Sequence, residues 1–303
     1  MLNLIFAAFL ISCSTEVGIM GYKNPNNDTS SSTVVDDQSD DLDASTDTSV
    51  DNDVEYENYG TTAYVHYKLR QVACPACLGV SSELSITFSA QFHDPITDSH
   101  TGWLPQAGTC TDNLYLISPS VVPLSAGSSI AVNSASHSFN VPQIGLGEYY
   151  TDSIWEAQYQ RDSVYTGQTD LGQFTFTSSH GFDYIEPYTL LWVDPSYAYD
   201  TVIYRGGQPN VFTWGPSGDG SLFVITVAVY SWDGSQFLGR IDCAEDDFGS
   251  MSIPGSYFQQ FPSGSLAAVH MVRHKVTLTE TDINNSFIET HMEWEVIGTA
   301  QLQ

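Results

Sequence analysis

Residues 222–243 read LFVITVAVYSWDGSQFLGRIDC, and this stretch decides the fold class. Its first part, 222–232, is rich in β-branched and aromatic residues. Between Val224 and Val229 it is apolar on both faces, which predicts a strand at the centre of a sheet. Asp233-Gly234 is a strong signal for a hairpin turn. We therefore expect residues 237–243 to return antiparallel beside the first strand.

A second pair of strands is expected at 265–278 and 286–298, joined by the polar turn TETDINN. Side chains alternate along the later strand, as on a half-buried strand. Its apolar side carries Ile288, Met292, Trp294 and Val296, and its polar side carries Glu289, His291, Glu293 and Glu295. In the neighbouring strand His270 and His274 would lie about 13 Å apart on a partly exposed face, too far apart to share a metal ion.

The same alternation appears nearer the N-terminus, over 63–70 and 84–92, with weaker strand signals near 113–117, 128–133, 153–159 and 172–178. Short strands, frequent turns and almost no helical period predict an all-β protein of antiparallel β-sandwich architecture. We expect an N-terminal β-rich domain at 60–180 and a second domain at 181–303. The second domain would have about seven strands, an immunoglobulin-like number.

The second half also resembles the C-terminal immunoglobulin-like modules of uncharacterised lipoproteins from predatory and social bacteria. The resemblance rests on the strand ending in Phe212-Thr213-Trp214 and on SGDG at 217–220, expected to be a hairpin. It continues with Cys243, the turn Asp246-Asp247-Phe248-Gly249 and Ser252-Ile253-Pro254. It implies a fold and carries no known activity.

The chain opens with MLNLIFAAFLISCST. Its apolar run, 4–11, is too short for a membrane-spanning helix, which needs about 20 residues, but it fits the apolar region of a secretory signal. Leu10-Ile11-Ser12-Cys13 resembles the lipobox of bacterial lipoproteins, although residues 2–12 lack the Lys or Arg with which such signals normally begin. The resemblance implies a signal peptide at 1–12 and a diacylglycerol on Cys13, which anchors stably in a membrane. The same resemblance implies the outer membrane and exposure at the cell surface, because in such lipoproteins an Asp directly after the lipidated Cys tends to retain the protein at the inner membrane, and here that residue is Ser14.

Residues 13–59 are expected to form a disordered acidic tether, because they are polar, charged and poor in large apolar residues. The whole chain has 8 Lys and Arg against 36 Asp and Glu, a formal net charge of −28. Such a polyanion repels phosphate groups, which excludes nucleic acid as a partner and disfavours direct docking on anionic lipid. The aspartates at 36–43 predict weak association with Ca²⁺ but no calcium loop, since no Gly lies between Gly21 and Gly60 to form its turn.

Five cysteines occur, at Cys13, Cys74, Cys77, Cys110 and Cys243. If Cys13 carries lipid, four remain in an exported chain, and disulfides are expected with three connectivities open. Cys74-Pro75-Ala76-Cys77 also has the spacing of a thiol-redox site, but no helix is predicted after it, so a structural disulfide is favoured. Zinc held by four cysteines would need a second close pair.

No metal site is expected. The weak candidates are His93, Asp94, Asp98 and His100, which offer zinc or copper ligand types in one loop, although turn formation explains the same residues. Glu289, Glu293 and Glu295 could serve glycoside hydrolysis if they lined a cleft. The aromatic residues Tyr149, Tyr150, Trp155, Tyr159, Tyr165, Tyr197 and Tyr199 would suit carbohydrate or protein contact if exposed, but strand packing is the favoured interpretation.

The sequence thus favours a non-enzymatic, lipid-anchored cell-envelope protein acting in binding, adhesion or envelope assembly, with an unidentified protein or carbohydrate partner. The alternative is a secreted or periplasmic hydrolase that uses carboxylates on envelope or polysaccharide material. A thiol-redox protein using Cys74 and Cys77 is a third hypothesis. The hydrolase hypothesis predicts two facing carboxylates, one of them with a raised pKa.

Overall fold

The computed structural model of the chain describes residues 60–72, 84–96, 105–112, 121–155, 158–182, 185–186, 201–281 and 286–303. The expected signal peptide at 1–12, the tether at 13–59 and the lipidation site Cys13 lie outside these residues. Cys74, Cys77, Asp98 and His100 also lie outside them.

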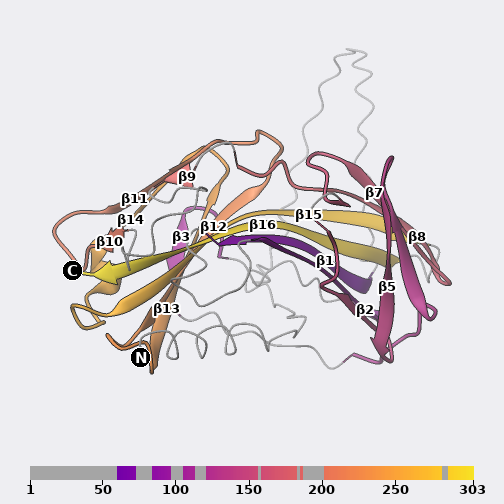
Figure 1. Cartoon of the computed structure of the whole chain (residues 1–303), viewed down its shortest axis with the longest axis horizontal. Helices are drawn as coiled ribbons and strands as arrows, with labels where there is room; N and C mark the ends of the chain where they lie inside the picture. The colour runs from indigo at the N-terminus through magenta and orange to yellow at the C-terminus, as the bar shows by residue number, and fades with distance from the viewer. Residues whose placement is uncertain are drawn as a thin grey trace, which may run out of the picture.

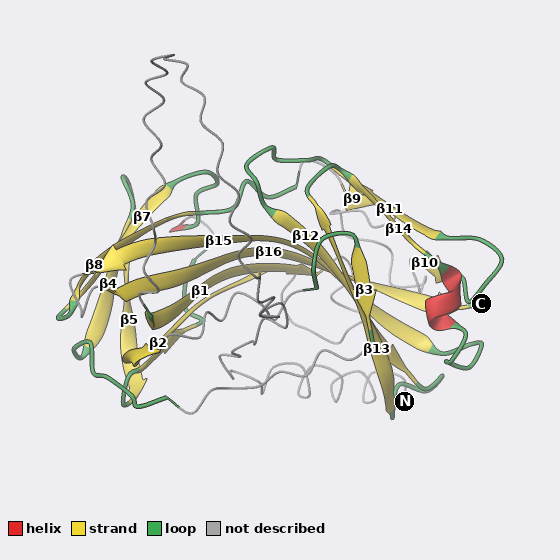
Figure 2. Ribbon diagram, turned by 180° about the vertical axis from the view of Figure 1, so that it is seen from behind, coloured by secondary structure: helices red, strands yellow, loops and turns green. Residues whose placement is uncertain are grey.

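The described residues are almost entirely β-strand, which confirms the all-β prediction (Figure 2). One short 3-10 helix, η3 (Gly255–Phe258), occurs among the strands, and the described ranges contain no α-helix. The strands are β1 (Thr61–Val72), β2 (Leu84–Ile96), β3 (Thr109–Thr111), β4 (Ser129–Asn133), β5 (Ser138–Gly145), β6 (Glu148–Thr151), β7 (Val164–Thr169), β8 (Gly172–Thr177), β9 (Ile185–Glu186), β10 (Thr201–Ile203), β11 (Asn210–Trp214), β12 (Leu222–Tyr230), β13 (Phe237–Asp246), β14 (Ser250–Ile253), β15 (Leu266–Thr281) and β16 (Ser286–Leu302).

Thirteen strands form one large sheet in the order β3-β13-β12-β15-β16-β1-β2-β6-β5-β4-β7-β8, with β10 beside the end of β16. The apolar strand β12 lies between β13 and β15, as predicted, and both expected antiparallel pairs form. The sheet is mixed rather than purely antiparallel, because β1 and β10 run parallel to β16. Since β1 lies between β16 and β2, strands from both expected domains share this sheet.

The long strands β15 and β16 run along the molecule, with β9, β11 and β14 near one end and β5, β7 and β8 at the other (Figure 1). At the second end the sheet folds back on itself. Thr279 of β15 donates a hydrogen bond from Oγ1 to the backbone oxygen of Thr175 in β8, at 2.9 Å. Aromatic rings fill this fold: the ring of Tyr67 in β1 lies 5.3 Å from that of Tyr165 in β7 and 5.8 Å from that of Phe176 in β8. Edge-on contacts of this kind add to the stability gained by burying the rings.

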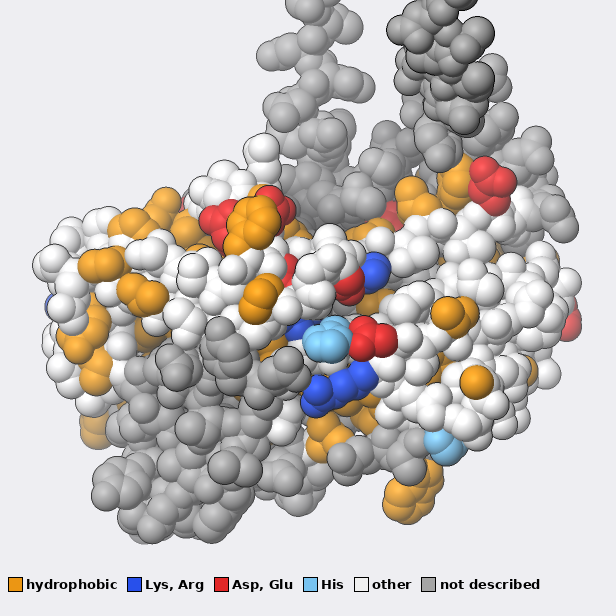
Figure 3. Space-filling view, turned by 90° about the horizontal axis from the view of Figure 1, so that it is seen from above, with side chains coloured by type: hydrophobic (Ala, Val, Ile, Leu, Met, Phe, Trp, Pro, Cys, Tyr) orange, Lys and Arg blue, Asp and Glu red, His pale blue; other side chains and the backbone are white. Residues whose placement is uncertain are grey.

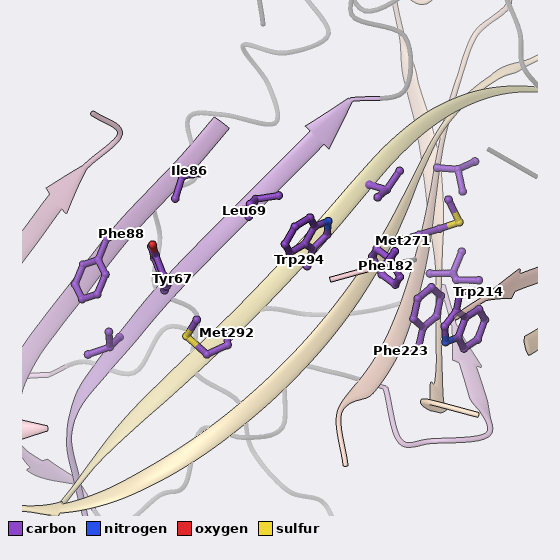
Figure 4. Close-up of a cluster of buried hydrophobic side chains, with 14 of the residues drawn as sticks. Tyr67, Leu69, Ile86, Phe88, Phe182, Trp214, Phe223, Met271, Met292 and Trp294 are labelled. Carbon is purple, nitrogen blue, oxygen red and sulfur yellow. The ribbon is translucent and has the colours of Figure 1, made fainter. Parts of the chain in front are cut away.

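A small sheet, in the order β14-β11-β9, lies over the other end of the same core. Trp214 of β11 stacks on Phe223 of β12, with ring centres 3.5 Å apart. The ring of Phe182 meets Phe223 edge-on at 5.7 Å. Figure 4 follows this apolar layer from Phe88 on β2, through Trp294 on β16, to Trp214. One continuous core therefore underlies both ends of the large sheet.

The prediction of a hairpin at GPSGDG (215–220) is wrong. β11 pairs with β14 and β9, whereas β12 pairs with β13 and β15, so this segment crosses from the small sheet to the large one. The carboxylate of Asp247 holds the crossing in place: it accepts hydrogen bonds from the backbone N–H of Ser217 at 2.8 Å and from Nε1 of Trp214 at 2.5 Å. Arg273, which is fully buried, donates to the same carboxylate from Nε at 3.0 Å.

The prediction of a strand at 153–159 is also wrong for the described part of that range. The backbone N–H of Gln158 turns back to the carbonyl of Trp155 at 2.8 Å, and the side-chain oxygen of Gln158 accepts the backbone N–H of Trp155 at the same distance. This closed local turn satisfies groups that a strand would have offered to a neighbour. The strands expected near 128–133 and 172–178 are confirmed as β4 and β8.

Cys110 of β3 and Cys243 of β13 form a disulfide, with their Cα atoms 4.0 Å apart. The two residues stand directly opposite each other in the antiparallel pairing of β3 with β13. The bond joins the short edge strand β3 to the sheet, and it assigns one of the pairs that the sequence left open.

A charged row on the sheet as the candidate functional site

The sheet face that carries the even-numbered residues of β1 bears a row of charged side chains. Residues 66, 68 and 70 of β1 stand directly beside 291, 293 and 295 of β16. Lys68 therefore faces Glu293, and Arg70 faces Glu295. Alternate residues of a strand point to opposite faces, so intervening side chains such as Tyr67 point into the aromatic core. The parallel pairing of β1 with β16 thus brings basic residues of one strand onto acidic residues of the other.

These opposite charges form a connected set of ion pairs. Nζ of Lys68 lies 3.0 Å from Oε2 of Glu293 and 3.0 Å from Oε2 of Glu295. Nε of Arg70 reaches the same oxygen of Glu295 at 2.6 Å. The other oxygen of Glu295 lies 2.7 Å from Nδ1 of His270 on β15. Both carboxylates are almost fully buried, at 6% and 3% exposed, whereas the side chains of Lys68 and Arg70 are 25% and 28% exposed.

The neighbouring cations keep both glutamates ionised despite their burial. Burial alone would raise the pKa of Glu293, but the charge of Lys68, with smaller contributions from His274 and His66, outweighs it and lowers the pKa to about 2. The pKa of Glu295 likewise lies well below its ordinary value, because Arg70 and Lys68 overcome the effect of burial. Carboxylates held in this way are poor proton donors near neutral pH.

Three histidines from three strands lie together beside the ion pairs, and we call them the histidine column: His66 of β1, His291 of β16 and His274 of β15. The rings of His66 and His291 are parallel, with centres 4.5 Å apart and an interplanar angle of 5°. Nε2 of His274 lies 3.0 Å from Nδ1 of His291. On the other side of His291, Nε2 lies 2.7 Å from a carboxylate oxygen of Glu289, which is fully buried.

Burial favours the neutral form of two of these histidines. It is the largest cause that lowers the pKa of His66 and of His274 to about 3, and the proximity of His291 lowers both further. The negative charge of Glu293 acts in the opposite direction but does not compensate. The expectation of a partly exposed histidine face is therefore wrong for His274, which is 1% exposed, and holds for His270, whose side chain is 15% exposed.

A separate carboxylate, Asp242 of β13, lies on this face of the sheet beyond β12 and β15. It accepts a hydrogen bond from Oγ1 of Thr226 at 2.6 Å and lies 2.7 Å from Nε of Arg240. Burial raises the pKa of Asp242, and the charge of Arg240 and the Thr226 hydrogen bond only partly oppose that rise. The same sheet thus holds one carboxyl group with a raised pKa and others, such as Glu295, with lowered ones.

The weak metal candidates do not come together in the described residues. β2 continues through His93 and Asp94, so the expected loop begins later, and the two side chains point to opposite sides of the strand. His93 is buried and its Nδ1 lies 2.8 Å from the backbone oxygen of Asp94, while Asp94 is exposed. Within the described ranges, no three His, Cys, Asp or Glu side chains are arranged to hold a metal ion.

The tyrosines serve mainly in packing, as the favoured interpretation predicts. Tyr149 and Tyr165 are buried, and Tyr149 also donates from its hydroxyl to the backbone oxygen of Gly127 at 2.7 Å. Trp155 differs, since 78% of its surface is exposed. Tyr197 and Tyr199 lie outside the described residues.

Sequence reasoning identified the acidic side of the last strand but missed its partners. The signal lay in the period of two at residues 64–70, which places His66, Lys68 and Arg70 on one side of a strand. Nothing in the sequence says that this strand lies beside the last one, so the pairing across 225 residues between Arg70 and Glu295 could not be found.

No protein family model, curated protein or solved structure matches the chain. Among the described residues, no helix has the length and apolar character needed to cross a bilayer.

Proposed function

We propose that this chain is an exported lipoprotein, anchored in the outer membrane through Cys13, whose all-β body binds a protein or carbohydrate partner at the cell surface. The Cys110–Cys243 disulfide carries the proposal, because such bonds persist in oxidising compartments outside the cytoplasm. The lipobox-like sequence at residues 10–13 adds the anchor, and the acidic stretch after it would hold the body away from the membrane.

Exposed aromatic side chains give the body a means of contact. Trp232 and Phe237 lie on either side of the Asp233-Gly234 turn, at the tip of the β12–β13 hairpin, and are 77% and 56% exposed. Rings of this kind contribute flat apolar area to protein and carbohydrate recognition. On the face shown in Figure 3, apolar side chains are scattered among uncharged groups, and charged side chains gather near the middle.

The anchor is tested by the intact mass of the protein purified from its native membranes. We expect a chain that lacks residues 1–12 and carries added acyl mass on Cys13. A Cys13→Ala variant should leave the membrane fraction, whereas the matched control Ser12→Ala keeps a small residue in the motif and should stay there. An unmodified N-terminus in membrane-derived protein would contradict the proposal.

The hydrolase alternative is favoured by one observation, the raised pKa of Asp242 on the same sheet as the ionised Glu295. Opposed pKa values are typical of acid and base pairs in glycoside hydrolysis when the two carboxyl groups lie about 5–10 Å apart, and here β12 and β15 lie between the strands of Asp242 and Glu295. If the protein hydrolyses polysaccharide, Asp242→Asn should reduce the release of reducing ends by roughly 100-fold or more. The control Asp233→Asn, at the exposed hairpin tip, should keep full activity. Wild-type protein that releases no reducing ends from peptidoglycan and envelope polysaccharides would rule the alternative out for those substrates.

A further inference from the structure

The histidine column joins three strands at the seam between β1 and the β15–β16 hairpin. His66 contributes from β1, His274 from β15 and His291 from β16. The seam between β1 and β16 is a parallel pairing, which is slightly less stable per residue than an antiparallel one. On its other side, β1 pairs antiparallel with β2.

We propose that the histidine column is an acid-sensitive contact, which holds β1 against β16 while His66 and His274 are neutral and weakens when they take up protons. This inference is independent of the membrane anchor and of any partner. It concerns how the central seam of the sheet responds to acid.

Hydrogen-bond geometry limits how many protons the column can hold. Nε2 of His274 and Nδ1 of His291 lie 3.0 Å apart, so one proton between them makes a hydrogen bond. Neutral imidazole has one donor and one acceptor nitrogen, whereas imidazolium has two donors. If both rings were imidazolium, two N–H groups would point at each other across this contact. A proton on His66 would also be opposed by burial and by its neighbours, because the His66 ring is stacked 4.5 Å from that of His291 and lies near Lys68.

The charged groups around the column do not compensate for added protons. β16 contributes Glu289, which already lies 2.7 Å from His291, and Glu293, which already pairs with Lys68 of β1. Further along the same face, Glu295 is paired with Arg70 and His270, and Asp242 of β13 is paired with Arg240. From β2, the residue directly opposite His66 is the uncharged Ser89. Additional positive charge in the column would therefore repel Lys68, and the described carboxylates beside the column already have cationic or histidine partners.

The sign of the pH effect follows from the two protonation equilibria. A histidine in the unfolded chain takes up its proton near pH 6.5, but the pKa of His66 and of His274 in the folded chain is about 3. The stability that these neutral rings contribute is therefore fully present above about pH 6.5 and is lost as the pH falls from there toward about 3. Between about pH 6 and pH 5, unfolded glutamates are still largely ionised, so histidines dominate the change.

Hydrogen exchange measured by mass spectrometry on peptides covering 61–72 tests the proposal in the full chain. The measured exchange rate divided by the intrinsic rate gives the opening constant of β1. This constant should rise as the pH falls from 6 to 5, by up to about tenfold for each of the two histidines. His66→Phe keeps an aromatic ring in the stack but cannot be protonated. In this variant the rise of the opening constant between pH 6 and pH 5 should therefore be smaller by a factor of up to about ten.

Two further variants make the result interpretable. His180→Gln changes an exposed histidine that lies 2.6 Å from Asp162 on another part of the surface, and it should leave the pH dependence of β1 unchanged. His66→Gln serves if His66→Phe does not fold, and it makes the same prediction. A pH dependence in β1 that is equal in wild type and in the folded His66 variant would overturn the proposal. So would β1 exchange that does not accelerate between pH 6 and 5.

Discussion

Removing the Cys110–Cys243 disulfide is expected to lower the free energy of unfolding by about 3–5 kcal/mol, the largest effect of any single bond described above. The bond closes a loop with a sequence separation of 133 residues. Opening so long a loop restores much conformational freedom to the unfolded chain. Without this bond, β3 would no longer be covalently joined to β13, and their backbone pairing would remain.

Denaturant unfolding of the double variant Cys110→Ala/Cys243→Ala, compared with the oxidised wild type, measures this effect. Adding a thiol reductant to the double variant is the control, because any further loss then comes from cysteines other than this pair. Equal unfolding midpoints for the double variant and the wild type would show that the bond contributes nothing to stability.

Asp247→Ala is expected to cost about 3–5 kcal/mol, because it leaves the fully buried Arg273 without its carboxylate. It also removes the acceptor for Trp214 and Ser217, which hold the crossing between the two sheets. Burial would raise the pKa of Asp247, but the hydrogen bonds from Ser217 and Trp214 and the charge of Arg273 lower it overall. Its stabilisation is therefore present above its ordinary pKa, near 4, and is lost in stronger acid.

Thermal or denaturant unfolding checks this second prediction. The matched control is Asp246→Ala, one residue earlier and exposed, which should change the free energy of unfolding by no more than about 0.5 kcal/mol. The double variant Asp247→Ala/Arg273→Met should recover part of the loss, because it removes the unpaired buried charge. If Asp247→Ala unfolded like Asp246→Ala, the ion pair would not stabilise the crossing.

Local signals were sufficient for the hairpins of the second half. Asp233-Gly234 fixes a turn through its own backbone preferences, and the apolar strand before it can only be stable at the centre of a sheet. The prediction of a hairpin at GPSGDG is wrong because Gly and Pro indicate a change in chain direction but do not indicate which sheet contains the next strand. That choice depends on Asp247 and Arg273, which come later in the chain.

Only the β16 side of the candidate site could be predicted from the sequence. The alternation at 288–296 shows which side chains share a face, but burial of that face depends on the long-range neighbours of β16. Glu293 would be an ordinary exposed carboxylate without Lys68, and His274 an ordinary surface histidine without His291 beside it. Because these contacts are fixed by sheet order, no local pattern in the sequence contains them.

The position of β16 also has a consequence for how fast the chain folds. β16 is the last described strand, yet it lies between β15 and the first described strand, β1. Contacts such as that between Arg70 and Glu295 join residues 225 positions apart, and such contacts give a high contact order. Chains dominated by distant contacts fold slowly, because the entropy of closing long loops is lost before the contacts form. Because the chain is synthesised from its N-terminus, β1 exists before β16, and the edge of β1 that pairs with β16 stays unpaired until β16 has formed. An unpaired strand edge of this kind is prone to aggregation.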